Sequence, residues 1–279
     1  MKRLWLTVLA ACILFSACSL PAKAPVLEIL ALDVGQGSCL LVRTPEGDIL
    51  IDAGAEAGQD RLVSRLHEMG VERIDLLILT HPDEDHLGGG DAIVYGFEVG
   101  AVWHNGDMRQ SEGMKLLCRA LEERSVPLKA VKTGDGINHG ALAITVLSPA
   151  TVTEGNAGSL VLKLDCLGLT ALIMGDADQR VEAALLQEYG ASQLGSTLLV
   201  AGHHGSHDAG SEAFLQAVAP RYTVISCEAG NAYGFPDGRT LARLEAVGSE
   251  ILRTDLHGEI CLRWMEGEAT PTVITEGST

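Results

Sequence analysis

The sequence has few basic residues and no long apolar run in its interior. Its 279 residues include 20 Lys and Arg against 37 Asp and Glu, a formal net charge of −17. This balance argues against a surface that grips an extended polyanion, because binding along a nucleic-acid backbone needs clustered Lys and Arg. No internal apolar segment reaches roughly 18 residues, which predicts that the chain does not cross a membrane more than once.

Proline is scarce, and cysteine pairs at short spacing are missing. With 9 Pro, 32 Gly and 47% apolar residues, the composition excludes a disordered or collagen-like chain. No C-x-x-C arrangement occurs, and the cysteines beyond residue 18 are odd in number, so they cannot all pair within one chain. Most of them lie in apolar, strand-like runs, which favours a role as small buried hydrophobic residues. These cysteines are Cys39, Cys118, Cys166, Cys227 and Cys261.

Residues 1–17 have the pattern of an export signal. Lys2 and Arg3 precede an apolar run that is too short to span a membrane as a stable helix. The small residues 16–17 before Cys18 resemble a bacterial lipoprotein signal, in which that cysteine is acylated and becomes the new N-terminus. Two alternatives stay open, namely Cys12 as the acylated residue and ordinary cleavage after Ala24. We therefore predict an exported protein that is lipid-anchored to the outer face of a bacterial membrane, or else secreted.

The predicted processing leaves an acidic mature chain with a short N-terminal tether. Removal of residues 1–17 leaves 18 basic and 37 acidic residues, a net charge of −19. Residues 18–25 are predicted to form the tether, residues 26–265 one folded domain, and the polar residues 266–279 a flexible tail.

Short apolar runs alternate with amphipathic helical patterns along the domain. Tight turns at 45–48 and 167–168 predict antiparallel hairpins, and helical patterns between other runs predict crossovers. The mixture predicts an α/β (α+β) fold, an αββα sandwich of two mixed β-sheets flanked by helices. The predicted strands are 26–32, 39–43, 49–52, 74–79, 99–103, 142–147, 160–165, 170–174, 197–200, 222–226, 251–253 and 259–264. The predicted helices are 60–69, 114–124, 179–189, 212–217 and 239–246.

The strongest chemical signal is the segment 80–89, which reads THPDEDHLGG and directly follows an apolar strand. Two imidazoles and two suitably spaced carboxylates lie within six residues. One loop of this kind can present His81 and Asp83 to one cation, and Asp85 and His86 to another. Carboxylates beside imidazoles suit Zn²⁺ or Mn²⁺, and the oxygen content favours Mn²⁺.

Three other predicted strands also end in polar residues of the kinds that bind metal. The strand 170–174 leads to Asp176, which is well placed to bridge two cations. The strand 197–200 leads to the adjacent His203 and His204, and the strand 49–52 ends at Asp52. A single Asp at a strand end is more often a turn cap. Together, however, these strand ends predict a set of ligands that face one rim of the sandwich. His104 and Asn105 also follow a strand, and they either line this cleft or pack elsewhere.

The combined pattern resembles the metallo-β-lactamase superfamily, whose loop is usually H-x-H-x-D-H and here reads H-x-D-x-D-H. This variant resembles the soluble domain of ComEC-type competence DNA-uptake proteins and its stand-alone exported relatives. Further segments carry the resemblance, which extends over about residues 26–264. They are DVGQG at 33–37, NAGSLVL at 156–162, HHGS at 203–206, YGFP at 233–236 and RTD at 253–255.

The resemblance implies a site with two divalent metal ions, Zn²⁺ or Mn²⁺. His81 and Asp83 match the ligands of one cation, Asp85 and His86 match those of the other, and Asp176 matches the bridging carboxylate. The metal ligand that comes last in the chain is one of the two adjacent histidines, with His204 favoured over His203. The sequence departs from the pattern at Asn156, where many superfamily members have a histidine. It departs again at Phe235, where the similar competence group usually has a histidine before the proline.

The implied activity is that of a metal-dependent hydrolase, with Asp85, Asp176 and His203 as the catalytic residues. Asp85 and Asp176 would orient the attacking water, and His203 or Ser206 would donate a hydrogen bond to the substrate. Asn156, Ser159 and Ser206 are the expected substrate-binding residues.

Resemblance and charge together restrict the substrate. The competence group favours phosphodiesters, DNA among them, whereas the net charge opposes binding along extended DNA. Two cations would restore positive charge where a phosphate must lie. A small or end-bound phosphodiester reconciles the two, while protein partners are not indicated. The alternatives are another hydrolytic substrate of the cell envelope, such as a β-lactam, and a non-catalytic, lipid-anchored binding module with a decayed site.

Overall fold

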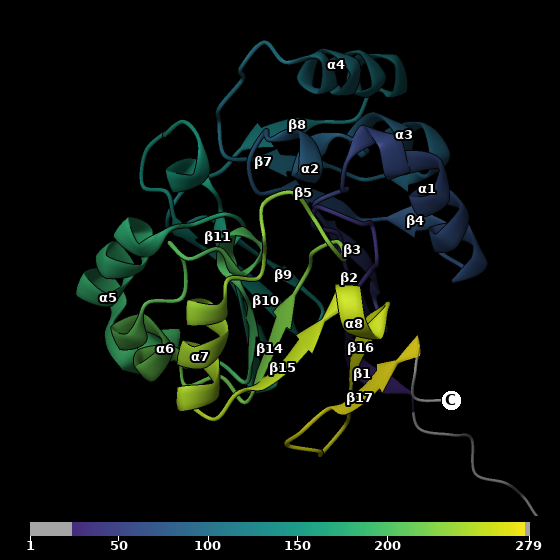
Figure 1. The fold of residues 1–279 in the computed structure, drawn as a ribbon. Coiled ribbons are helices and arrows are strands. Elements are labelled where there is room, and N and C mark those ends of the chain that lie inside the picture. Colours follow the sequence, from purple (N-terminus) through teal and green to yellow (C-terminus); the bar gives the residue numbers. More distant parts are fainter. Residues whose placement is uncertain (1–23, 277–279) are drawn as a thin grey trace, which may run out of the picture.

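Two large β-sheets pack face to face in the computed structural model, which describes residues 24–276 (Figure 1). The first sheet has the strand order β17-β16-β1-β2-β3-β5-β7-β8. Its strands are β1 (Pro25–Ala31), β2 (Leu40–Thr44), β3 (Gly47–Ile51), β5 (Leu76–Leu79), β7 (Val102–His104), β8 (Leu128–Ala130), β16 (Ile260–Met265) and β17 (Thr272–Thr275). Strands β3, β5, β7 and β8 pair in parallel, and the remaining pairs of this sheet are antiparallel.

The second sheet has the strand order β15-β14-β13-β12-β11-β10-β9. Its strands are β9 (Gly136–His139), β10 (Leu142–Ser148), β11 (Val161–Cys166), β12 (Leu169–Ile173), β13 (Leu198–Val200), β14 (Tyr222–Ile225) and β15 (Glu250–Arg253). Strands β12 to β15 are parallel, whereas β9 to β12 form antiparallel hairpins. A short ribbon pairs β4 (Arg73–Ile74) with β6 (Glu98–Val99).

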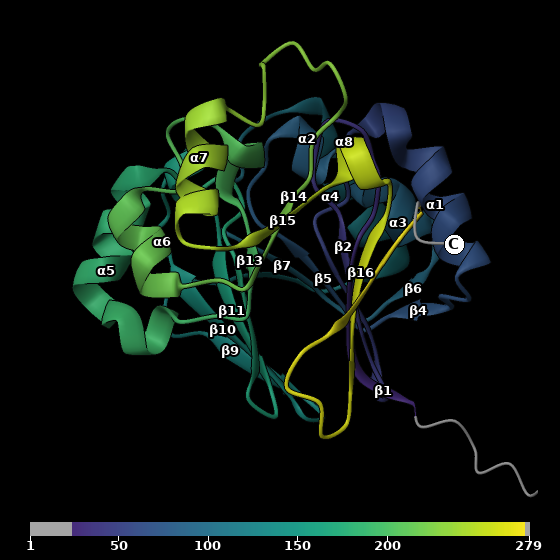
Figure 2. The same cartoon turned by 60° about the horizontal axis from the view of Figure 1, so that its bottom comes forward.

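Helices cover the outer face of each sheet (Figure 2). Buried residues of α1 (Gln59–Glu68), α3 (Gly90–Gly96) and α4 (Glu112–Arg124) pack against the first sheet. Buried residues of α5 (Gln179–Leu194), α6 (Glu212–Val218) and α7 (Gly238–Ala246) pack against the second. The short helices α2 (Glu84–Leu87) and α8 (Thr254–His257) connect loops. No helix in residues 24–276 is both long and apolar enough to cross a membrane.

The central core lies between the sheets and follows from alternation along the strands. In β1, for example, Leu27, Ile29 and Ala31 point toward the second sheet, because successive side chains of a strand face opposite sides. Residues from both sheets, including Trp103 and Trp264, form this one buried cluster. The predicted αββα sandwich is therefore confirmed.

The structure also differs from the predictions at several elements. The predicted strand 74–79 is two strands, β4 and β5, and 99–103 is likewise divided between β6 and β7. The segment 266–279 is not simply a flexible tail, because β17 pairs with β16 from Ile260–Thr275 to Arg263–Thr272. Helices α2, α3 and α8 and strands β8 and β9 were not predicted. The predicted signal peptide and Cys18 lie outside the described residues.

Candidate metal centre

The polar residues at the strand ends meet at one edge of the sandwich. His81 and the α2 loop follow β5 of the first sheet, and Asp176 follows β12 of the second. His203 and His204 lie in a short 3-10 turn, Gly202–Gly205, directly after β13. Both sheets therefore contribute side chains to one cluster, as the sequence predicts.

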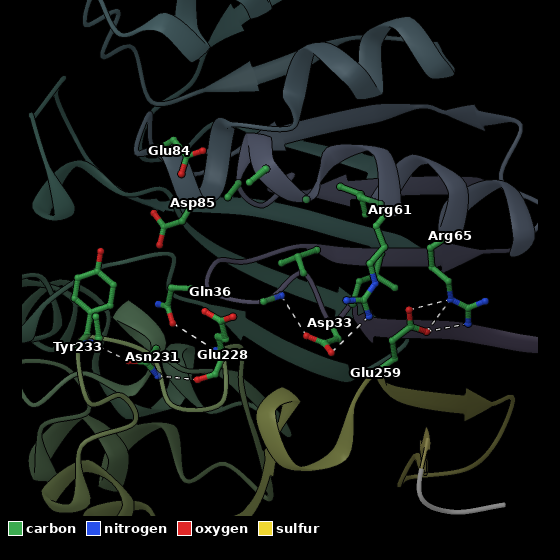
Figure 3. A pocket seen from close by; sticks show the side chains of 18 residues that line it. Asp33, Gln36, Arg61, Arg65, Glu84, Asp85, Glu228, Asn231, Tyr233 and Glu259 are labelled. Atoms are coloured by element: carbon green, nitrogen blue, oxygen red, sulfur yellow. Dashed lines mark hydrogen bonds and ion pairs between the residues drawn. The ribbon is translucent and has the colours of Figure 1, made fainter.

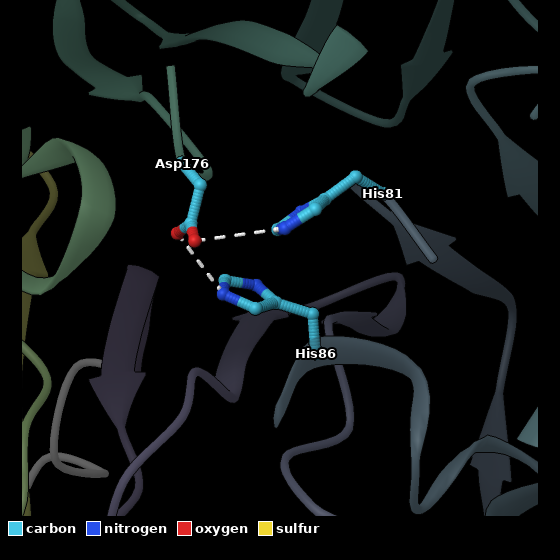
Figure 4. Close-up of side chains that lie close together, drawn as sticks. All are labelled: His81, His86 and Asp176. Carbon is cyan, nitrogen blue, oxygen red and sulfur yellow. Dashed lines mark ion pairs between the residues drawn. The ribbon is translucent and has the colours of Figure 1, made fainter. Parts of the chain in front are cut away.

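The carboxylate of Asp176, from the second sheet, faces His81 and His86 of the first (Figure 4). Its Oδ1 is 3.0 Å from His86 Nε2 and 3.6 Å from His204 Nε2. Its Oδ2 is 3.6 Å from His81 Nε2 and 3.9 Å from His203 Nε2. The two oxygens thus face different groups of histidines, which is the arrangement that a bridging carboxylate needs.

Asp83 and Asp85 approach the same cluster from opposite sides. Asp83 Oδ2 is 3.6 Å from His81 Nε2, and Asp85 Oδ2 is 3.2 Å from His204 Nε2. His86 Nε2 and His204 Nε2 are 3.2 Å apart. Atoms bound to one cation at the usual 2.0–2.2 Å lie about 3–3.6 Å apart. The spacings therefore suit two adjacent cations, with Asp176 shared between them.

Hydrogen bonds orient three histidines so that each Nε2 faces the centre. His86 Nδ1 donates to Asp52 Oδ2 at 2.7 Å, and His204 Nδ1 donates to the carbonyl of Ser226 at 2.8 Å. The Thr80 hydroxyl donates to Asp52, which leaves its oxygen to accept from His81 Nδ1 at 3.1 Å. With Nδ1 protonated, each neutral imidazole carries its lone pair on Nε2, the atom that can bind a metal.

Two buried atoms at the centre, His81 Nε2 and Asp176 Oδ1, face only charged neighbours and make no well-directed hydrogen bond among the described residues. Buried polar atoms are normally satisfied, so such orphans call for a ligand. Two overlapping groups have ligand atoms close enough to hold an ion, His81–His86–Asp176 and Asp85–His86–His204. The residues therefore fit a centre of two divalent cations.

The electrostatics of the cluster favour paired charges. Burial alone raises the pKa of Asp176, but the charge of His86 and the close contacts with the His81 and His86 rings outweigh it and hold that pKa well below its usual range. Burial likewise lowers the pKa of His86, but Asp176 and Asp52 raise it well above the ordinary value. Asp176 is thus ionised and His86 carries a proton, and a cation bound at His86 Nε2 would take the place of that proton.

The backbone is held in uncommon conformations around the cluster. His203 and His204 have φ values of +48° and +53°, and Asp52 has φ +62°. Side chains with a Cβ adopt this left-handed region rarely, so the surrounding structure must stabilise it. The result is that two adjacent histidines point to different places. His204 is buried and faces Asp85, while His203 is partly exposed beside Asn156, 3.3 Å away.

The structure changes the interpretation of two predicted substrate-binding residues. Ser159 is fully buried, and its hydroxyl accepts a hydrogen bond from the Asp176 backbone N–H at 3.0 Å. Ser206 is also buried, with its carbonyl bonded to Thr240. Neither side chain is displayed to a substrate, so we correct both assignments. Asn156 is partly exposed beside His203, where it can contact a substrate.

Arg109 belongs to no motif of the sequence, yet the structure places it at the rim of the cluster. Its guanidinium donates to Asp83 Oδ1 at 2.6 Å and to Asp107 Oδ2 at 2.7 Å. The hydrogen bond from His81 lowers the pKa of Asp83, and the charge of Arg109 acts in the same direction. His104 and Asn105 are buried, and the Asn105 amide donates to the carbonyl of Gly158, so they support a turn near the site.

A cleft of about 690 Å³ adjoins the cluster on the side of Asp85. Figure 3 shows Asp85 and Tyr233 at one end of it and Arg61 and Glu259 at the other. The cleft lies between the loop before β2, the start of α1 and the loop that follows β14. A molecule bound at the cluster has room to extend into it.

A sandwich of two mixed sheets with histidines and aspartates from both sheets at one edge defines a metal-dependent hydrolase of the αββα class. The sequence matches the family description of the metallo-β-lactamase superfamily over residues 32–229. The chain belongs to this superfamily, whose members are typically dependent on two metal ions.

Competence proteins are among the relatives of the chain. Competence protein ComA of Neisseria gonorrhoeae is 36% identical over 230 residues, which cover 82% of this chain and 31% of that protein. ComE operon protein 3 of Bacillus subtilis is 29% identical over 267 residues, covering 88% and 34% respectively. The chain therefore spans about a third of the length of these relatives. The metallo-β-lactamase-fold protein YhfI of Bacillus subtilis superposes with a TM-score of 0.57 over 89% of this chain and 99% of YhfI, at 11% identity.

Proposed function

We propose that this protein is an exported phosphodiesterase that depends on two divalent cations, Zn²⁺ or Mn²⁺, and acts on short or end-bound phosphodiesters. The observation that carries the proposal is the position of Asp176, whose two oxygens face separate groups of histidines at 3.0–3.9 Å. The competence proteins among its relatives support a phosphodiester substrate related to DNA.

Each side chain of the centre has a distinct role in this proposal. His81 and Asp83 would hold one cation, and Asp85, His86 and His204 would hold the other, with Asp176 shared. Cations bound there would lower the pKa of a water molecule and stabilise negative charge on the phosphoryl oxygens. Asp85 and Asp176 would also orient the attacking water through their carboxylate oxygens.

His203 lies beside the cation site rather than inside it. Its Nδ1 is 3.3 Å from Asp208 Oδ1, and its side chain is partly exposed. In its protonated form it can keep this pairing and donate a hydrogen bond from Nε2 to the phosphoryl group or to the leaving oxygen. Asn156, in contact with His203, would fix the orientation of this ring. These two residues therefore form the substrate side of the centre.

The preferred length of the substrate follows from charge. The cleft next to Asp85 is lined by five carboxylates and two arginines, so it offers little attraction to further phosphates. The least repulsion is expected for a substrate with a single phosphate in the site. Its reacting phosphate would lie on the cations, and the part that extends into the cleft would carry no second negative charge. This supports a small or end-bound phosphodiester over an extended DNA strand.

For location, we propose attachment to the outer face of a bacterial membrane through a lipid on Cys18. The basic and apolar pattern of residues 1–17 supports this, and so do the competence-related names of the relatives. Cells fed a labelled fatty acid should incorporate it into the wild-type protein and not into Cys18→Ser. Equal labelling of the two proteins would contradict acylation at this cysteine.

The decisive test of the function combines metal analysis with hydrolysis. We expect the purified protein to bind two Zn²⁺ or Mn²⁺ per chain and to hydrolyse bis(4-nitrophenyl) phosphate and short oligonucleotides. Asp176→Asn should lose at least about 100-fold in kcat/KM, because it removes a charged group from the transition-state environment. Asp165→Asn is the matched control, since Asp165 is exposed near the end of β11, in the second sheet, and none of the contacts of the cluster involves it.

Three outcomes would contradict the proposed function. Only trace metal in the purified protein, with none taken up from solution, would exclude the binuclear centre. Unchanged diester hydrolysis by Asp176→Asn would exclude the proposed chemistry even if metal is bound. Stable binding of two cations without hydrolysis of any diester would instead support a binding module.

A further inference from the structure

Tyr233 is the most exposed aromatic side chain in residues 24–276, at 68%. An exposed tyrosine usually packs only part of its ring against neighbouring residues. Here the ring stacks on Phe235, with centroids 5.5 Å apart and planes 18° from parallel. Phe235 in turn contacts the ring of His203 edge-on, with centroids 5.3 Å apart. The three rings form a continuous series that leads from the cation site to the cleft.

The loop that carries Tyr233 is held by one side chain, Asn231. Its Oδ1 accepts from the backbone N–H groups of Tyr233 at 3.1 Å and Phe235 at 3.0 Å. Its amide nitrogen donates to the carbonyls of Phe235 at 2.7 Å and Glu228 at 2.9 Å. Four hydrogen bonds from one side chain order the loop before any ligand binds, which lowers the entropy cost of using Tyr233 as a contact.

Tyr233 lines the cleft at the end where Asp85 lies. Figure 3 shows Tyr233 and Asp85 at the same end of the cleft, with Gln36 beside them. Gln36 Oε1 accepts from the Glu228 N–H at 3.4 Å, which leaves its amide hydrogens available to a ligand. A flat aromatic face and an amide donor are the groups that recognise a nucleobase.

The charges of the cleft exclude a second phosphate. Arg65 forms a bidentate pair with Glu259 at 2.8–3.1 Å, and Arg61 lies 3.7 Å from Asp33. Each arginine therefore already faces a carboxylate. Glu84 and Glu228 also line the cleft and carry negative charge toward it. These charges disfavour an anionic group, and the aromatic ring of Tyr233 suits a flat, uncharged one such as a nucleobase.

We propose that Tyr233 is a specificity-determining residue, which stacks on the base of the nucleoside attached to the reacting phosphodiester. This inference rests on the proposed function, and it adds that the substrate is a nucleotide diester whose terminal nucleoside occupies the cleft. The stacking fixes the leaving or the retained nucleoside relative to the cations. Asn231 acts through Tyr233 as a positioning residue.

The test compares two ligands that differ only in their bases. The first is a thymidine dinucleotide with a non-hydrolysable methylenephosphonate linkage, and the second is its abasic analogue with both bases removed. Binding to the full-length protein with Mn²⁺ is measured by calorimetry. We expect wild type to prefer the base-bearing ligand by about 10- to 100-fold, the range that base–aromatic stacking gives. Tyr233→Ala should reduce this preference to less than about threefold, and Tyr233→Phe should restore most of it.

Tyr95 provides the matched control, because it is a second exposed tyrosine and lies on α3 outside the cleft. Tyr95→Ala should keep the wild-type preference. Equal binding of the two ligands by wild type, or an unchanged preference in Tyr233→Ala, would overturn the stacking role. Neither result would affect the proposed phosphodiesterase function, which the hydrolysis assay tests separately. Failure of wild type to bind either ligand would overturn this inference, and loss of hydrolysis of every diester would separately overturn the proposed function.

Discussion

At the scale of single residues, the centre depends on groups that never touch a substrate. Asp52 is the most connected of them. Its carboxylate accepts from the Thr80 N–H at 2.8 Å, from the Thr80 hydroxyl at 3.0 Å and from His86 Nδ1 at 2.7 Å. Because these bonds set the tautomer of both His81 and His86, Asp52 determines whether their Nε2 atoms can bind a cation.

We therefore predict that Asp52→Asn weakens metal binding by about 10- to 100-fold, because the amide nitrogen cannot accept from His86 Nδ1. The backbone should tolerate this change, since asparagine is one of the residues that adopt the φ of +62° found here. Metal titration against a competing chelator measures the effect. Asp165→Asn should bind metal as wild type does. A cation affinity of Asp52→Asn equal to that of wild type would show that His86 does not need this partner.

The residues also show how far sequence reasoning reaches. The sequence motif contains His81, Asp83, Asp85 and His86 in one loop, so their proximity could be predicted. The roles of Ser159 and Arg109 could not, because they arise from contacts between segments far apart in the chain. Ser159 bonds the Asp176 backbone across 17 residues, and Arg109 reaches Asp83 across 26.

At the scale of elements, the loops of the centre are packed directly on one another. The His86 carbonyl accepts from the Ala53 N–H at 2.7 Å, and the Gly89 N–H donates to Gly54 at 3.1 Å. A Cβ at Gly89 would lie 2.4 Å from the Ala53 carbonyl oxygen, closer than any real contact. The α2 loop can approach the β3 loop only because this position has no side chain.

We predict that Gly89→Ala lowers the free energy of unfolding by about 1–3 kcal/mol, because the two loops must separate. The displacement also moves His86, so metal affinity should fall together with stability. Urea denaturation, with its midpoint and slope, measures the first effect.

Gly238→Ala is the control for this substitution. Gly238 is the first residue of α7, and an alanine Cβ at this position would have no other atom within 4 Å. Alanine should therefore change stability by less than about 1 kcal/mol, in the stabilising direction. Equal unfolding free energies for Gly89→Ala and wild type would mean that the loops can part without cost.

Elements were easier to predict than their exact limits. The apolar run 26–32 and the turn at 45–48 marked strands correctly, because both signals are local. The division of 74–79 into β4 and β5 was missed, since the run is apolar throughout most of its length and only tertiary pairing with β6 and β3 distinguishes its parts. Strand β17 was missed for a similar reason, because its four β-branched residues lie in an otherwise polar segment and only the pairing with β16 identifies them as a strand.

At the scale of the whole molecule, the candidate centre lies across the boundary between the two halves of the sandwich. His81, Asp83, Asp85 and His86 belong to loops of the first sheet, whereas Asp176 and His204 follow strands of the second. The fold class could be predicted because the alternating pattern of strands and helices extends over the entire domain. The acidic net charge gains a local meaning as well, since several of its carboxylates converge on this boundary.

Cations bound at this boundary would link the two sheets, so their removal should loosen both. We predict that a chelator lowers the melting temperature of the metal-loaded protein, because a ligand at 100 times its Kd stabilises the native state by about 2.7 kcal/mol. Without cations, the buried carboxylates and imidazoles have only one another as partners. Backbone amide hydrogen exchange should therefore become faster in residues 80–89 and 202–206 together. Asp176→Asn, which lacks the shared carboxylate, should show a much smaller response to the chelator. Exchange that rises in the first-sheet loop alone would mean that the cations bind there without joining the sheets, and an unchanged melting temperature would mean that they do not contribute to the fold.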